Sequence, residues 1–200
     1  MPSRTCCLKM PIPILDPAPP HGKAQLHGFT LLEALVAMAL LGILVGLAAP
    51  AMSGLRTRQQ LQGQGEAFLN SLVLARSEAL RRQQRVSICA QGLDAQCDTL
   101  GRWQQGWLVF ADTNHNGLRD SGEVLIEARS AVPVAIQVGV SNTVKTYFSY
   151  NAEGRSASAS GAFMAGTWRF CRPGSSAGWQ VVVNALGRPR IEAYTVQLCS

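Results

Sequence analysis

The segment from Ala34 to Leu55 contains no charged residue over 22 positions. As a helix it would be roughly 33 Å long, enough to cross a bilayer core of about 30 Å. A buried core helix is the alternative, but a segment this long and apolar on every face fits a membrane span better. The sequence therefore predicts a transmembrane helix here. The whole chain is 47% hydrophobic and 15% charged, a composition that excludes a disordered protein.

The residues before this segment read His27-Gly28-Phe29-Thr30-Leu31-Leu32-Glu33. A secretory signal would be cut after a shorter apolar stretch, whereas the small residue Gly28 precedes this one. The stretch resembles the processing site of type IV pilins and pseudopilins, and Pro50 matches the family's kink position. The resemblance implies that a prepilin peptidase cuts after Gly28, removes residues 1–28 as a leader and methylates the new N-terminus at Phe29. The start of the leader, Met1 or Met10, stays open.

Glu33 places a carboxylate at the beginning of the apolar segment. Such a charge inside a membrane costs about 2.5–3.5 kcal/mol, so it requires a partner. After cleavage, the amine of Phe29 and the side chain of Glu33 lie on the same helix face. The resemblance implies that Glu33 binds the N-terminal amine of a neighbouring subunit during assembly. A simple interaction of Glu33 with the helix dipole is the alternative.

The cysteines indicate an oxidising compartment. Cys6 and Cys7 lie in the leader, and an even number remains in the mature chain, which predicts two disulfides in the periplasm. Three pairings are possible; we expect the short loop Cys89–Cys97 together with Cys171–Cys199. A Cys₄ zinc site is disfavoured because the chain has no C-x₂-C pair. Basic residues on both sides of the apolar segment leave its orientation weakly determined, so the cysteines favour a single-pass inner-membrane protein with a periplasmic C-terminal domain.

The pattern after the apolar segment predicts an α+β fold. A continuous helix from about Phe29 to Gln83 would have a transmembrane half and an amphipathic half, with an apolar stripe that continues past Met52. The stripe consists of Leu61, Phe68, Leu69, Leu72, Val73, Ala75, Ala79 and Leu80. Expected strands are 85–90, 106–111, 124–128, 135–140, 144–150, 167–172, 180–184 and 190–198. The helix would pack on this antiparallel sheet, giving a leader (1–28), a transmembrane and assembly segment (29–55) and a globular domain (56–200).

Several motifs in the globular domain are similar to those of the FimT/GspH branch of the pilin-like superfamily. They are Cys89…Cys97, the predicted strand Trp103–Phe110, the Asp112-rich turn and the ending Asn184–Arg190. The resemblance implies a minor pilin or pseudopilin that assembles with other pilins through its N-terminal helix.

The segment from Asp112 to Glu123 matches the spacing of an EF-hand calcium loop. The ligands would be Asp112, Asn114, Asn116, Asp120 and Glu123, with Gly117 at the sixth position. However, strands and not helices are expected to flank it, and Asn, Asp and Gly are equally typical of a tight turn. We favour the turn and keep a membrane-tethered calcium-binding module as the alternative.

An enzymatic function is not expected. The chain has no P-loop and no G-x-G-x-x-G segment before a helix. His115 is the one histidine after the predicted cleavage site, and it lies in the turn just described. The sequence therefore indicates neither a catalytic site nor a cofactor.

The C-terminal part carries the positive charge of the mature chain. From Ser141 onward there are six basic and two acidic residues, a charge asymmetry that suggests a surface for a polyanion. Gly187-Arg188-Pro189-Arg190 looks like the GRxR motif of FimT-type minor pilins, which implies DNA binding. In an extended segment Arg188 and Arg190 would project to the same side and contact phosphates without reading sequence. Auxiliary charges would come from Arg169, Arg172 and Lys145.

The leading interpretation is thus a FimT-like minor type IV pilin in or at the tip of a pilus, with a role in pilus biogenesis and DNA uptake during natural transformation. A GspH-like minor pseudopilin of a type II secretion system is the alternative within the same family.

Overall fold

The computed structural model describes residues 29–197 and 199, and the chain divides into two compact units, residues 1–45 and 46–200. One helix, α1 (Leu31–Arg82), contributes to both units. Thr30 caps its start, because the Glu33 N–H donates to Thr30 Oγ1 at 3.2 Å. At the other end Gln83 has a φ of +54°, which stops the helix. These bounds confirm the expected helix to within two residues.

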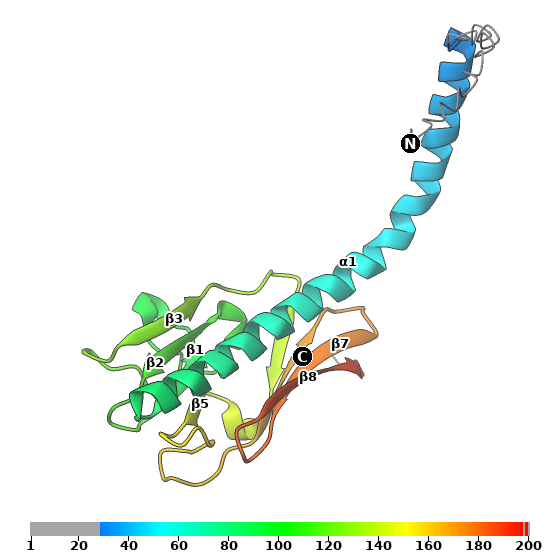
Figure 1. Ribbon diagram of the computed structural model, residues 1–200. Helices are drawn as coiled ribbons and strands as arrows, with labels where there is room; N and C mark the ends of the chain where they lie inside the picture. The colour runs from blue at the N-terminus through cyan, green and yellow to red at the C-terminus, as the bar shows by residue number, and fades with distance from the viewer. Residues whose placement is uncertain (1–28, 198, 200) are drawn as a thin grey trace, which may run out of the picture. The chain divides into compact units, whose positions relative to one another are not determined.

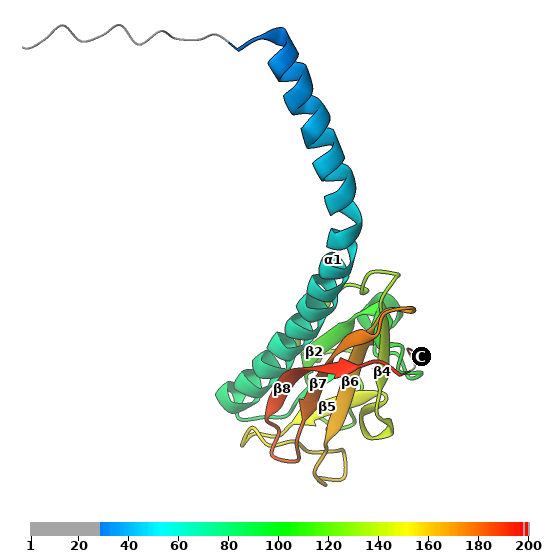
Figure 2. The same cartoon turned by 90° about the vertical axis from the view of Figure 1, so that its right-hand side faces the viewer.

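Eight strands follow the helix, and each corresponds to a predicted strand. They are β1 (Val86–Ala90), β2 (Trp107–Ala111), β3 (Leu125–Arg129), β4 (Gln137–Val140), β5 (Tyr147–Tyr150), β6 (Gly166–Cys171), β7 (Ala177–Val183) and β8 (Pro189–Thr195). They form two antiparallel four-stranded sheets, in the orders β3-β2-β1-β5 and β4-β6-β7-β8 (Figures 1 and 2). The α+β class with a helix on antiparallel strands is confirmed, but the strands form two sheets where the sequence suggested one.

An aromatic cluster joins α1 to the sheets. Phe68 of α1 lies 5.6 Å from Trp103, 5.1 Å from Trp107 and 4.8 Å from Trp168, measured between ring centroids. Most of the predicted stripe is buried, namely Leu61, Phe68, Leu72, Ala75 and Ala79. Val73 and Leu80, also expected in the stripe, are 50% and 44% exposed. Each lies one residue, or about 100° of rotation, beyond a buried position, and so leaves the interface.

The segment around Trp103 also differs from the prediction. Trp103–Gln105 forms a short 3-10 turn, and the strand begins only at Trp107. Gly106 separates the two with a φ of +104°. The indole of Trp103 is buried, and its N–H donates to the Lys145 carbonyl at 2.7 Å. The aromatic residue therefore fixes a connection and does not extend the strand.

Both disulfides have the expected pairing. Cys89–Cys97 and Cys171–Cys199 each bring their Cα atoms to 5.7 Å. The first bond belongs to a second apolar cluster that contains Cys89, Leu108 and Phe110. The second bond connects the end of β6 to the chain beyond β8.

Candidate functional site

Gly187 and Arg188 lie in the turn from β7 into β8, and Pro189 and Arg190 begin β8. Asn184 organises this turn, since its Oδ1 accepts the N–H groups of Leu186 at 3.1 Å and Arg188 at 3.0 Å. The side chain of Arg188 is exposed and has no ion pair with any described residue. A hydrogen-bonded turn thus presents an uncompensated guanidinium at one end of the sheet.

Arg190 has a different environment on the edge strand β8. Its Nε donates to Glu192 Oε2 at 3.2 Å, and the other oxygen of Glu192 accepts from Gln180 Nε2 at 2.8 Å. The hydrogen bonds from Arg190 and Gln180 lower the pKa of Glu192. Glu192 therefore stays ionised and partly neutralises Arg190. Residues i and i+2 of a strand share a face, so the alternation in the sequence could have revealed this pair.

Gly187 is buried and has a φ of +73°. A Cβ atom at this position would lie 2.8 Å from Tyr150 Cε1 and 3.0 Å from Ser156 N. The sequence analysis assigned Gly187 to the turn and to close approach of a phosphate. The structure places the glycine against Tyr150, so its role is in the turn and in packing.

The predicted auxiliary charges lie in three different places. Arg169 of β6 is exposed and in register with Gln180 and Glu192, so it shares the face of Arg190. Lys145 follows Val144, which packs against Gly166 near the turn end of the sheet. Arg172 lies in the β6–β7 connection, at the opposite end of the seven-residue strand β7. That separation, about 23 Å, removes Arg172 from the Arg188 surface.

The structure adds Arg155 to the site; the sequence analysis counted it among the six basic residues after Ser141 but did not assign it to DNA binding. The hydroxyl of Ser156 donates to the Ala185 carbonyl at 2.7 Å, which brings this segment against the β7–β8 turn. Arg155 is exposed, and its N–H donates to Asn151 Oδ1. No local pattern signals this proximity, because the contact joins segments 29 residues apart.

The Asp112–Glu123 loop is satisfied by its own hydrogen bonds. The buried carboxylate of Asp112 accepts from Ser87 Oγ and from the N–H groups of Asn116 and Gly117. Glu123 accepts from Thr113 and from the Asp120 N–H. Among the described residues, no group of three or more His, Cys, Asp or Glu side chains could hold a metal ion. The hydrogen bonds are those of a polar turn, and calcium binding by this loop stays an untested alternative.

Only part of the predicted processing site lies within the described residues. Gly28 and the rest of 1–28 lie outside them, whereas Phe29 and Glu33 are described and exposed. Glu33 makes no ion pair within the described residues.

In the predicted membrane span, the side chains of residues 45 and 47–53 lie outside the described part of the structure. No helix in the described part of the chain is both long and apolar enough to span a membrane. The transmembrane helix therefore stays a prediction.

Similarity to known proteins is found over most of the chain. The family model for the type II transport protein GspH matches residues 64–187, and the model for the prokaryotic N-terminal methylation motif matches residues 25–49. The pilin-like protein PilA1 of Thermus thermophilus is 36% identical over 97 residues, which cover 48% of this chain and 55% of that protein. The chain thus spans about half the length of this curated relative.

Solved structures with the same arrangement include the type IV minor pilin FimU of Pseudomonas aeruginosa. It matches with a TM-score of 0.51 and 20% identity over 71% of this chain and 96% of FimU, which shows a shared fold. The minor pseudopilin EpsH of Vibrio cholerae matches with a TM-score of 0.47 and 13% identity, over 67% of this chain and 97% of EpsH. The GspH model alone spans more than half of the chain, and the methylation motif precedes it. The chain is therefore a member of the GspH family, a minor pilin or pseudopilin of the GspH/FimT kind.

Proposed function

We propose that this chain is a FimT-like minor pilin that binds DNA through Arg188 and Arg190 and serves DNA uptake in natural transformation. The main observation behind the proposal is the guanidinium of Arg188, which is exposed in the β7–β8 turn and has no ion pair among the described residues. Arg190 and Arg169 extend the positive surface along the outer face of the sheet, and Arg155 lies beside the turn.

Binding through this surface would be sequence-independent. Guanidinium groups bind phosphates bidentately, and no helix in this part of the chain is available to enter a groove. Arg188 can bind a phosphate at once, whereas Arg190 must first exchange Glu192 for a phosphate. Arg188 should therefore contribute more to affinity than Arg190, and Glu192 should oppose DNA binding.

The test measures the affinity for a labelled DNA duplex as a function of salt. Arg188→Gln should weaken binding and reduce the magnitude of the slope of log K against log salt by roughly 0.7–0.9, the value for one lost phosphate contact. Arg190→Gln should have a smaller effect, and Glu192→Gln should strengthen binding. Arg172→Gln is the matched control, because it removes the same charge at the opposite end of β7. Unchanged binding and transformation in the Arg188→Gln/Arg190→Gln variant would refute the proposal.

We also propose the maturation and location that the N-terminal motif implies. A prepilin peptidase cuts between Gly28 and Phe29 and releases 1–28; residues 29–55 anchor the protein in the inner membrane; residues 56–200 fold in the periplasm. The match to the methylation motif and the uncharged run from Ala34 to Leu55 support this arrangement. A Gly28→Val variant should accumulate as precursor; a mature-sized product would contradict the cleavage site.

The second candidate is a GspH-like pseudopilin of a type II secretion system, which the description of the matching family favours. Deletion of the gene separates the two: loss of transformation supports the first, and loss of protein secretion with normal transformation supports the second.

A further inference from the structure

A cleft lined by three arginines lies between α1 and the β6–β7 loop, at the end of the domain opposite to Arg188. Its volume is about 630 Å³, and its lining includes Arg56, Arg58 and Arg172 but no acidic residue. All three arginines are exposed, and none forms an ion pair with a described residue. Three arginines that border one cleft, with no counter-charge among its described lining residues, make the cleft attractive to a phosphate.

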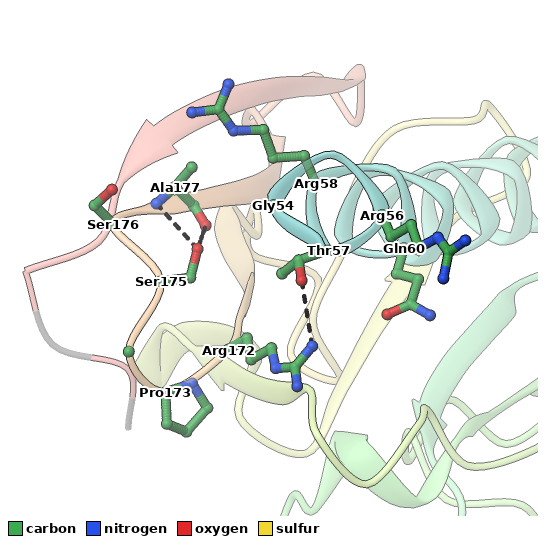
Figure 3. A pocket seen from close by; sticks show the side chains of 11 residues that line it. Gly54, Arg56, Thr57, Arg58, Gln60, Arg172, Pro173, Ser175, Ser176 and Ala177 are labelled. Atoms are coloured by element: carbon green, nitrogen blue, oxygen red, sulfur yellow. Dashed lines mark hydrogen bonds between the residues drawn. The ribbon is translucent and has the colours of Figure 1, made fainter. Parts of the chain in front are cut away.

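The wall that carries Arg172 is a hydrogen-bonded turn. The loop turns at Pro173-Gly174, where the Ser175 N–H donates to the Arg172 carbonyl at 3.0 Å and Gly174 has a φ of +80°. The disulfide of Cys171 precedes it directly. Arg172 Nη1 also donates to Thr57 Oγ1 at 3.2 Å, which places its guanidinium across the cleft from the loop to α1 (Figure 3).

A second groove of about 740 Å³ adjoins the cleft and shares Arg58, Ser176 and Ala177 with it. Its lining includes Leu55, Trp179 and Tyr194. Leu55 is 51% exposed, and both aromatic rings are half-buried. Trp and Tyr side chains favour the headgroup level of membranes, where one part of the ring is apolar and the other is wet.

We propose that the two cavities together bind an anionic phospholipid, with the phosphate held by the arginines that border the cleft and the glycerol and upper acyl carbons on Leu55 and Trp179. The apolar groove favours a lipid over a free phosphate or duplex DNA, because neither of these buries an apolar surface there. Position along the chain agrees, because Arg56 is the first charged residue after the uncharged run. The proposal rests on the membrane anchoring proposed above but not on DNA binding.

Native mass spectrometry of the full chain in uncharged detergent tests the site with phosphatidylglycerol, phosphatidylcholine and inorganic phosphate as probes. We expect preferential retention of phosphatidylglycerol, and a loss of its apparent affinity on the order of tenfold in Arg58→Gln/Arg172→Gln. Leu55→Ser, at a half-exposed position, should also weaken lipid retention. Arg188→Gln is the matched control and should retain lipid as the wild type does.

Three outcomes would overturn the proposal. Equal retention of both lipids, or no effect of the double arginine variant, would show that the cleft does not select the headgroup. Displacement of the lipid by millimolar phosphate, with no effect of Leu55→Ser, would identify a free-phosphate site. A loss of DNA affinity equal to that of Arg188→Gln, with lipid retention unchanged, would identify a nucleic-acid surface. Carbonate extraction of membranes measures anchoring separately, so failure of the anchor and failure of the lipid site are distinguishable.

Discussion

Gly187 combines a left-handed backbone with close contact to Tyr150, and both conditions favour glycine. Gly187→Ala should lower the free energy of unfolding by about 1–3 kcal/mol through backbone strain, and overpacking against Tyr150 should add about 1–3 kcal/mol. Urea unfolding followed by tryptophan fluorescence measures both effects. Gly174→Ala is the control: its φ is +80°, but nothing lies within 4 Å of the added Cβ. Equal losses for the two variants would contradict the packing role of Gly187.

Single residues of the candidate site were predictable where the signal was local. Arg188 and Arg190 follow from a four-residue motif, and Cys89–Cys97 closes a short loop. Arg155 was missed because its place beside the turn depends on a hydrogen bond between distant segments. The sequence analysis assigned Arg172 to the same DNA-binding surface as Arg188. A count of basic residues does not show at which end of a strand each of them lies.

At the scale of elements, the last turns of α1 contain a pH-sensitive contact. Glu78 accepts hydrogen bonds from Arg81 at 2.6 Å and from Arg82 at 2.6 Å, which lower its pKa from 4.5 to about 2. A lowered pKa stabilises the fold above pH 4.5, and this stabilisation is lost as the pH falls from 4.5 toward 2. Glu78→Gln should therefore cost about 0.5–1 kcal/mol at pH 7 and flatten the dependence of stability on pH in that window.

The control for this contact is Glu66→Gln, which removes another carboxylate of α1. The carboxylate of Glu66 accepts a hydrogen bond from the side-chain amide of Gln62 and not from an arginine. Urea unfolding at a series of pH values compares the variants. If Glu78→Gln keeps the full acid dependence of the wild type, the arginine contacts do not stabilise the end of the helix.

The Cys171–Cys199 bond should stabilise the sheet that contains the edge strand β8. It spans 28 residues, for which loop entropy gives about 3–4 kcal/mol. Cys171→Ser/Cys199→Ser should lower the free energy of unfolding by this amount and speed amide exchange in β8. The matched pair Cys89→Ser/Cys97→Ser opens a loop of 8 residues and should lose about 2.5 kcal/mol by the same reasoning. Unchanged exchange in β8 without Cys171–Cys199 would contradict the assigned role of the bond.

The elements themselves were predictable because their signals are local. Runs of Val, Ile, Phe, Tyr and Trp between turn residues predicted all eight strands, and a period of 3.6 predicted the helix. The division into two sheets was not predictable, because pairing depends on contacts between distant strands. Gly65 shows the same limit: a glycine lowers the propensity of a helix, whereas an added Cβ here would lie 2.8 Å from Ile191 Cδ1. The glycine allows β8 to approach the helix.

At the scale of the whole molecule, the two arginine surfaces lie at opposite ends of β7. The proposed DNA surface surrounds the β7–β8 turn, and the proposed lipid cleft is formed by the β6–β7 loop and residues 54–60 of α1. The cleft follows the uncharged run in the sequence, whereas the turn lies at the far end of the strand.

Assembly of this chain with other pilins should depend on Glu33. Its carboxylate is exposed in the first turn of α1 and has no ion pair among the described residues, so it is accessible to the N-terminal amine that we propose as its partner in another subunit. An unpaired carboxylate in a membrane costs about 2.5–3.5 kcal/mol, so replacing Glu33 with Gln should not reduce the amount of protein in the membrane. The substitution should remove the electrostatic attraction between Glu33 and the N-terminal amine of the next subunit. We expect the variant to be processed and inserted but to be depleted at least tenfold from sheared filaments, measured by immunoblotting. Glu66→Gln, an exposed carboxylate in the globular half of α1, is the control and should assemble normally. Normal incorporation of Glu33→Gln into filaments would show that helix packing alone recruits this subunit.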